Sequence, residues 1–325
     1  MIKTTDFPAL TAYLDSVYNE AASNTLADLV GFKVFRVGET PFETHAHTIL
    51  HGLGGLSKVA QGSDFANLSL AEGDSVTWTQ THYAGLVSVT KDMRIFERTD
   101  EIENLVRSVT DSTFNQIDQV LADVLLNGFS SANYTDAYSE SVAATGYDGL
   151  AFFSASHTNN LNSNVFSNII TYSTVNPVIS REAIIAAQVA ARKYKDPSGV
   201  RRPVNLDTIL VSPDKYDDAM RIVYSDKVSG EFINDTNKVL NGSLRVMQWE
   251  KLALSSGGTD TTAYWYMFDS KKVGEALRLL FKQRPKLDAP DIPYKNKDWD
   301  YTIDTYHTVG RGYSPSVYGS NASGA

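Results

Sequence analysis

The chain has 325 residues, of which 42% are hydrophobic and 21% charged, and its formal net charge at pH 7 is −9. The composition is that of a folded globular protein. Because an acidic chain repels the phosphate backbone of nucleic acids, the net charge argues against sequence-specific nucleic-acid binding. The absence of cysteine excludes disulfides and thiolate metal sites, and no signal peptide or apolar run of about 18 residues indicates export or a membrane partner.

The sequence of the first residues predicts short helices that are separated by interruptions. Leu10, Leu14 and Val17 recur at spacings of three and four, which is typical of a helix, and Gly31 breaks the pattern. We therefore expect residues 1–56 to form an N-terminal arm with short helices rather than a domain.

Residues 57–92 show a strong alternation of side chains that is typical of extended strands. In "SVTWTQTHYAGLVSVT", residues 75–90, neither of the two alternating faces is fully apolar. Such a two-sided β-hairpin is marginal alone and needs a partner surface, so we predict an extended loop that lies on another subunit. The candidate inter-subunit contacts are Val76, Trp78, Gln80, Tyr83, Leu86 and Val87.

The strongest local pattern is a long amphipathic helix over Arg98–Asn127, capped by Thr99 with Asp100 and ended by Gly128. A coiled coil is one interpretation, and a helix lying across a sheet is the one we prefer. The apolar stripe consists of Ile102, Val106, Val109, Thr113, Ile117, Val120 and Val124.

The second half of the chain mixes helices and strands. We predict a helix over Ser180–Lys195, a buried strand over Leu206–Ser212 and a helix opening at Pro213. "SLRVMQWE" and "TAYWYMFD" predict a β-hairpin, and the tail from Trp299 to Val309 alternates again. This order of elements indicates an α+β fold with non-local strand pairing.

Two stretches raise the question of chemistry. "GLAFFSASHTNN" places Ser154 and Ser156 beside His157, but no nucleophile elbow precedes them, so a polar turn is the better interpretation. "THAHTILH" offers His45, His47 and His51, of which the last two would share a helix face, without the glutamate of a zinc protease. We expect no catalytic, cofactor or metal site and no enzyme activity.

The ordered set of elements resembles the tailed-phage major capsid proteins of the Hong Kong 97-type fold, in particular the Mu-like head subunits. "GYDGLAFFSASHTNN" looks like the segment after their spine helix, and "LDTILVSPDKYDDAMRIVYSD" is similar to their central strand–proline–helix unit. "NGSLRVMQWEKL" with "AYWYMFD" resembles the strand pair that follows. "WDYTIDTYHTVGRGYSPSVYGSN" is like their closing strands.

This resemblance implies that the chain is divided into five parts. The first two are the N-terminal arm (1–56) and the extended loop (57–92). The spine helix and peripheral domain would span 93–177, an axial domain 178–269, and C-terminal strands returning to the peripheral domain 270–325. Homo-pentamers and homo-hexamers would form an icosahedral shell around double-stranded DNA bound without sequence specificity. Portal proteins, together with scaffolding or cement proteins, would be partners, and assembly in the host cytoplasm would yield the virion capsid.

Three alternatives stay open, and one of them is a coiled-coil interaction protein built on Arg98–Asn127, which should form rods and not shells. An encapsulin-like compartment shell would share the fold and hold protein cargo instead of DNA. A serine hydrolase using His157 belongs to a different class, and it requires a serine hydroxyl bonded to that ring.

Overall fold

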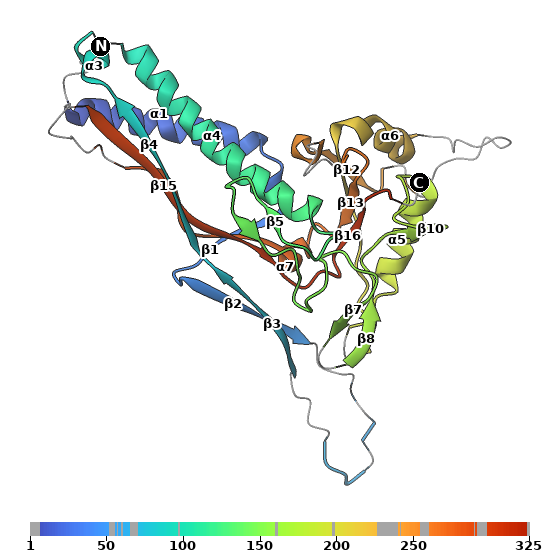
Figure 1. The fold of residues 1–325 in the computed structure, drawn as a ribbon. Coiled ribbons are helices and arrows are strands. Elements are labelled where there is room, and N and C mark those ends of the chain that lie inside the picture. The colour runs from blue at the N-terminus through green and yellow to red at the C-terminus, as the bar shows by residue number, and fades with distance from the viewer. Residues whose placement is uncertain are drawn as a thin grey trace.

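The computed structural model describes residues 7–51, 56, 58–59, 61–65, 71–96, 98–159, 162–196, 199–225, 240, 242–253, 260–288, 290 and 298–323. A long sheet lies beside two long helices, a second sheet with its own helices lies next to them, and a hairpin projects from the body (Figure 1). The mixed composition of helices and strands confirms the predicted α+β class.

The two long helices pack along each other. α4 (Thr99–Leu126) confirms the predicted helix, although its N-cap residue is Arg98 and no side chain caps it. α1 (Phe7–Asp28) buries Leu10 and Leu14 in a core that it shares with α4. The prediction of an N-terminal arm with short helices is therefore wrong for this segment, because one long helix forms and its apolar stripe finds a partner within the same chain.

The long sheet has the strand order β1-β14-β15-β4. Its strands are β1 (Arg36–Glu39), β14 (Leu277–Leu287), β15 (Trp299–Arg311) and β4 (Thr81–Val89). β15 buries alternate residues along most of its length, which confirms the predicted alternation, and β1 joins β14 in parallel register. We call this sheet together with α1 and α4 the peripheral unit.

The projecting hairpin consists of β2 (Thr44–His51) and β3 (Ala71–Thr79), which pair antiparallel. β3 does not turn back onto β4; instead β4 pairs with β15 from Trp299↔Val89 to His307↔Thr81. The predicted hairpin within residues 75–90 is therefore wrong, because each of its two strands finds a partner far away in the sequence.

The second sheet has the order β12-β11-β13-β16 and carries α5 (Arg181–Arg192) and α6 (Pro213–Tyr224). We call it, with these helices, the central unit. Its strands are β12 (Arg245–Gln248), β11 (Thr208–Val211), β13 (Trp265–Phe268) and β16 (Val317–Ser320). The predicted pairing of β12 with β13 is wrong, because the fully buried β11 lies between them.

The two units share one hydrophobic core. The C-terminal half of α4 contributes Leu121 and Leu125, the central sheet contributes Tyr266 and Phe268, and Phe281 comes from β14. The predicted C-terminal segment 270–325 supplies β14 and β15 to the peripheral sheet, but its last strand, β16, pairs with β13.

Short elements complete the described chain. They are α2 (Gly31–Val34), α3 (Lys91–Ile95), β5 (Tyr134–Thr135), β6 (Ser141–Val142), β7 (His157–Asn159), β8 (Asn162–Phe166), β9 (Thr171–Tyr172), β10 (Thr174–Val175), the 3-10 helix η1 (Glu250–Ala253) and α7 (Val273–Ala276).

Candidate assembly surface

Trp78, one of the predicted inter-subunit residues, anchors the hairpin to its own subunit. Its indole is buried and stacks on His45 and His47, with ring centroids 5.8 and 5.5 Å away. A Cβ added at Gly310 of β15 would lie 2.6 Å from the indole, so the ring rests directly on the backbone of the long sheet. Trp78 thus fixes where the hairpin leaves the body.

The other predicted contact residues divide by exposure. Val87 is buried in the peripheral core, and Val76, Gln80 and Tyr83 are partly buried. The Tyr83 ring stacks on Tyr138 with centroids 3.9 Å apart. Within this set, Leu86 on the edge strand β4 keeps an exposed apolar side chain, at 66%.

Several exposed apolar residues escaped the sequence prediction. Between β2 and β3, Leu56 is 91% and Phe65 88% exposed. Ile95 and Phe96, just after β4, are also exposed. The signal that could have revealed them is a large apolar side chain outside any periodic pattern.

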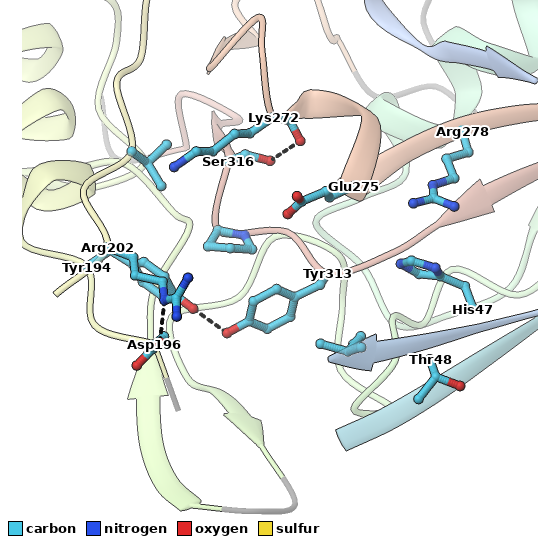
Figure 2. Close-up of a pocket in the computed structure, with 13 residues that line it drawn as sticks. His47, Thr48, Tyr194, Asp196, Arg202, Lys272, Glu275, Arg278, Tyr313 and Ser316 are labelled. Carbon is cyan, nitrogen blue, oxygen red and sulfur yellow. Dashed lines mark hydrogen bonds and ion pairs between the residues drawn. The ribbon is translucent and has the colours of Figure 1, made fainter. Parts of the chain in front are cut away.

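A pocket of about 390 Å³ lies where the base of the hairpin meets both units (Figure 2). Its walls come from β2, the segment after α5, the region around α7 and the tail after β15. The lining residues are His47, Thr48, Ile49, Tyr194, Asp196, Arg202, Val204, Lys272, Glu275, Arg278, Tyr313, Pro315 and Ser316.

The pocket wall is held in place by hydrogen bonds. Arg202 Nε donates to Asp196 Oδ2 over 2.5 Å, and the Tyr194 and Tyr313 hydroxyls bond each other. Lys272 Nζ donates to the carbonyl of Pro203 over 3.2 Å. Each of these contacts joins segments from different parts of the sequence or closes a turn, so the wall is built before any ligand arrives.

Electrostatics in the pocket favour a neutral histidine beside several cations. Burial, and to a smaller extent the nearby Arg278 and His45, lowers the pKa of His47 to about 4. Burial also lowers the pKa of Arg278, and Arg36 adds repulsion. At neutral pH the positive charge of the pocket therefore comes from its arginines and Lys272.

His157, the candidate catalytic histidine, is bonded as a structural residue. Its Nδ1 lies 2.7 Å from Asp148 Oδ2, and its Nε2 lies 3.2 Å from the Phe152 carbonyl and 3.1 Å from Asn168 Oδ1. Because the second nitrogen faces these two acceptors and not Ser154 or Ser156, the geometry contradicts the serine hydrolase hypothesis.

The surroundings of His157 bring three segments together. Asn168 is fully buried, and its Nδ2 donates to the Phe152 carbonyl and to Ser314 Oγ in the tail. Burial raises the pKa of Asp148, but the hydrogen bond and charge of His157 outweigh it and bring the pKa below its usual value. The cluster locks the chain after α4 to the C-terminal tail.

The histidines of "THAHTILH" lie on strand β2 and not on a helix, so the expected helical i, i+4 arrangement is wrong. Within the described residues, no three histidine, aspartate or glutamate side chains gather in a way that could hold a metal ion. No helix in the described part of the chain is both long and apolar enough to cross a lipid bilayer.

Comparisons with known proteins agree with this architecture. Residues 73–315 match the family model described as phage capsid protein. A chain from Gordonia phage Cozz is 9% identical and superposes with a TM-score of 0.50, covering 90% of this chain and 85% of its own. No curated protein matches the chain.

Two further solved structures are similar over most of their length. The capsid structure of cyanophage P-SCSP1u is 12% identical with a TM-score of 0.49, covering 88% of this chain and 85% of its own. The acidic stable capsid of Helicobacter pylori bacteriophage KHP30 is 13% identical with a TM-score of 0.48, covering 88% and 86%. With the family match over residues 73–315, the chain belongs to the phage capsid protein family and has the Hong Kong 97-type fold.

Proposed function

We propose that this chain is a major head subunit whose copies form pentamers and hexamers that close into an icosahedral shell around double-stranded DNA. The observation that carries the proposal is the β2–β3 hairpin. It projects from the body (Figure 1), and Leu56 and Phe65 between its strands are almost fully exposed. Large exposed apolar side chains mark contact sites, and a neighbouring subunit would cover them.

The charge of the chain supports a container for DNA. The excess of 38 acidic over 29 basic residues gives the net charge of −9. Such a wall repels the phosphate backbone, so packaged DNA need not adhere to it and no base-specific contact is required. The DNA would be held by enclosure.

The proposed division of labour follows the two units. The peripheral unit, with the α4 spine, would form the shell wall between pentamers and hexamers, and the central unit, near the predicted axial domain 178–269, would lie around their axes. The hairpin would link neighbouring subunits. The linking segment in this proposal is residues 44–79 and not the predicted extended loop 57–92, because β4 belongs to the peripheral sheet.

The remaining partners belong to the same proposal. A shell that receives DNA needs a portal, and scaffolding or cement proteins would assist or decorate it. Assembly would take place in the host cytoplasm. Membership of the Mu-like group also stays a prediction, carried by the segment around His157 and the closing strands.

Electron microscopy of the purified, overexpressed chain, with light scattering, tests the proposal. We expect closed shells or rings of five and six subunits from the wild type. The double variant Leu56→Ser/Phe65→Ser should stay dispersed while its circular dichroism remains that of the wild type. Val189→Ser, a matched change of an exposed apolar residue on α5 of the central unit, should assemble. A wild type that stays monomeric even with a co-expressed scaffold contradicts the shell proposal.

The contents of the shell separate a phage head from a compartment that holds enzymes. The family match favours the head. Shells recovered from infected cells should contain double-stranded DNA protected from nuclease. Shells that contain one protein cargo and no nucleic acid would instead support the encapsulin-like alternative.

A further inference from the structure

We propose that the pocket at the base of the hairpin binds the carboxylate side chain of an aspartate or glutamate from a neighbouring copy of this chain. The inference rests on the proposed assembly into a shell, and it assigns one specific contact within it.

The first support is a pair of arginines on neighbouring strands. Arg36 of β1 and Arg278 of β14 are direct partners in the parallel register. Within the described part of the chain, no carboxylate lies within ion-pair distance of either guanidinium. Arg278 Nε donates to the Gly274 carbonyl over 2.8 Å, which is a neutral acceptor. Like charges on adjacent strands repel, so an added anion would stabilise this pair.

The rest of the pocket has the same excess of positive charge. Lys272 is bonded to a neutral carbonyl. Asp196 already accepts from Arg202 and from the backbone N–H of Val200, so Glu275 is the one lining carboxylate that faces Lys272 and Arg278. Figure 2 shows Glu275 between these two cations. Three cations against two carboxylates leave the pocket positive when His47 is neutral.

The size of the pocket selects the kind of anion. Its volume of about 390 Å³ is at the small end of ligand cavities, which measure about 300–1,000 Å³. A side chain fits this space. A DNA duplex, whose major groove alone is about 12 Å wide, is too large to enter it and can touch only the rim. Arg278 lies within the wall and is half-buried, so a side chain that enters the pocket approaches it more closely than a duplex that rests on the rim.

The composition of the chain identifies the source of the carboxylate. Asp and Glu exceed Lys and Arg by 38 to 29, so every neighbouring copy presents carboxylates at its surface. A guanidinium and a carboxylate form short, charge-assisted hydrogen bonds with defined geometry. One such contact beside the hairpin base would fix the angle between neighbouring subunits.

Zero-length crosslinking tests the proposal directly. Shells are assembled from a mixture of ¹⁴N- and ¹⁵N-labelled chains, treated with a water-soluble carbodiimide, digested and analysed by mass spectrometry. We expect a mixed-isotope crosslink that joins Lys272 to an acidic residue of a second copy. Lys215, which lies 3.2 Å from Asp218 on the same helix, is the control and should give crosslinks within one chain.

Charge removal gives an independent readout. Arg278→Gln and Lys272→Gln should each raise the dissociation constant between subunits about tenfold, as expected for the loss of one charge-assisted hydrogen bond. Arg278→Lys should restore part of the loss. Arg221→Gln on α6, where the exposed guanidinium pairs with Asp217, is the matched control and should assemble like the wild type.

The outcomes distinguish this inference from the shell proposal. Shells that form normally but carry no mixed-isotope crosslink at Lys272 overturn the pocket assignment and leave the shell intact. A wild type that never assembles overturns both. Inter-chain crosslinks at Lys272 that persist in Arg278→Gln with unchanged affinity also overturn it, because the pocket would then not recognise the carboxylate.

Discussion

Trp249 donates a hydrogen bond of 2.9 Å from its indole Nε1 to Oδ2 of Asp118, in the middle of the long helix α4. The other oxygen of the same carboxylate accepts the backbone N–H of Gly31 over 2.8 Å. Both Asp118 and Trp249 are 1% exposed. A single buried carboxylate therefore joins the segment after α1, the spine helix and the central unit.

We expect Asp118→Ala to destabilise the subunit strongly. Two buried N–H groups would lose their acceptor, and each such loss costs about 1–3 kcal/mol, so the free energy of unfolding should fall by roughly 3 kcal/mol. Urea unfolding of the dispersed subunit measures it. Asp217→Ala, which removes a surface ion pair on α6, is the control and should change little. Equal effects of the two substitutions would contradict a special role for Asp118.

Asp118 also gives a pH signature. Burial raises its pKa, and the hydrogen bonds from Trp249 and Gly31 counteract this only in part. A carboxyl with a raised pKa in the folded state binds its proton more tightly there than in the unfolded chain. The part of the stability that is linked to this proton is fully present below the ordinary pKa of about 3.9 and is lost as pH rises through the folded value. Asp118→Ala should lack this dependence.

Elements with a local pattern could be predicted from the sequence. The stripe through Ile102, Val106 and Ile117 predicts α4, because spacings of three and four place these side chains on one face of a helix. Ser180 predicts the start of α5, and its hydroxyl does accept the N–H of Ala183. The alternation from Trp299 onward predicts β15 for the same local reason.

Strand partners could not be predicted, because pairing depends on residues far apart in the sequence. The side chains of Thr81–Val89 alternate in the same way whether the strand pairs with β3, its neighbour in the sequence, or with β15. Only the assembled sheet shows that the partner is β15. The pocket is equally non-local, since His47, Arg202 and Arg278 meet only when three segments fold together. The sequence predicts that Trp78 contacts a neighbouring subunit, because nothing in the residues around it indicates that its ring packs on Gly310.

Gly310→Ala should displace the base of the hairpin. The new Cβ would lie 2.6–2.8 Å from atoms of the Trp78 indole, which cannot yield without moving β3. Overpacking of this kind costs about 1–3 kcal/mol, and the tryptophan fluorescence should shift as the indole leaves its site. Gly85→Ala on β4 is the control, because nothing lies within 4 Å of its added Cβ. Unchanged melting temperature and fluorescence in Gly310→Ala would show that the indole does not rest there.

Asp148→Asn should weaken the cluster that holds the tail. Removing one partner of a buried pair costs about 3 kcal/mol, and His157 Nδ1 would face an amide instead of a carboxylate. Because the pKa of Asp148 is lowered, its stabilisation is present above about pH 4 and is lost as pH falls through the folded value. Melting curves should therefore differ from the wild type at pH 7 and converge toward pH 2, whereas Asp217→Asn should match the wild type at both. A constant difference at all pH values would contradict this origin.

His307→Phe should stabilise the subunit in mild acid. Burial lowers the pKa of His307 to about 4, its Nδ1 has no hydrogen-bond partner, and its ring contacts Tyr83 and Phe281. The folded state thus resists protonation while the unfolded state accepts it, so wild-type stability falls as pH drops from about 6.5 to about 4.

The loss corresponds to roughly 3 kcal/mol across that interval, since each pKa unit is worth about 1.4 kcal/mol. Urea unfolding at pH 7 and pH 4.5 measures it, and the variant should lose less stability than the wild type between the two. His47, whose pKa is also about 4, contributes a second loss over the same interval, so His307→Phe should remove only part of the total. An equal loss in variant and wild type would show that burial does not lower the pKa of His307 in the folded subunit.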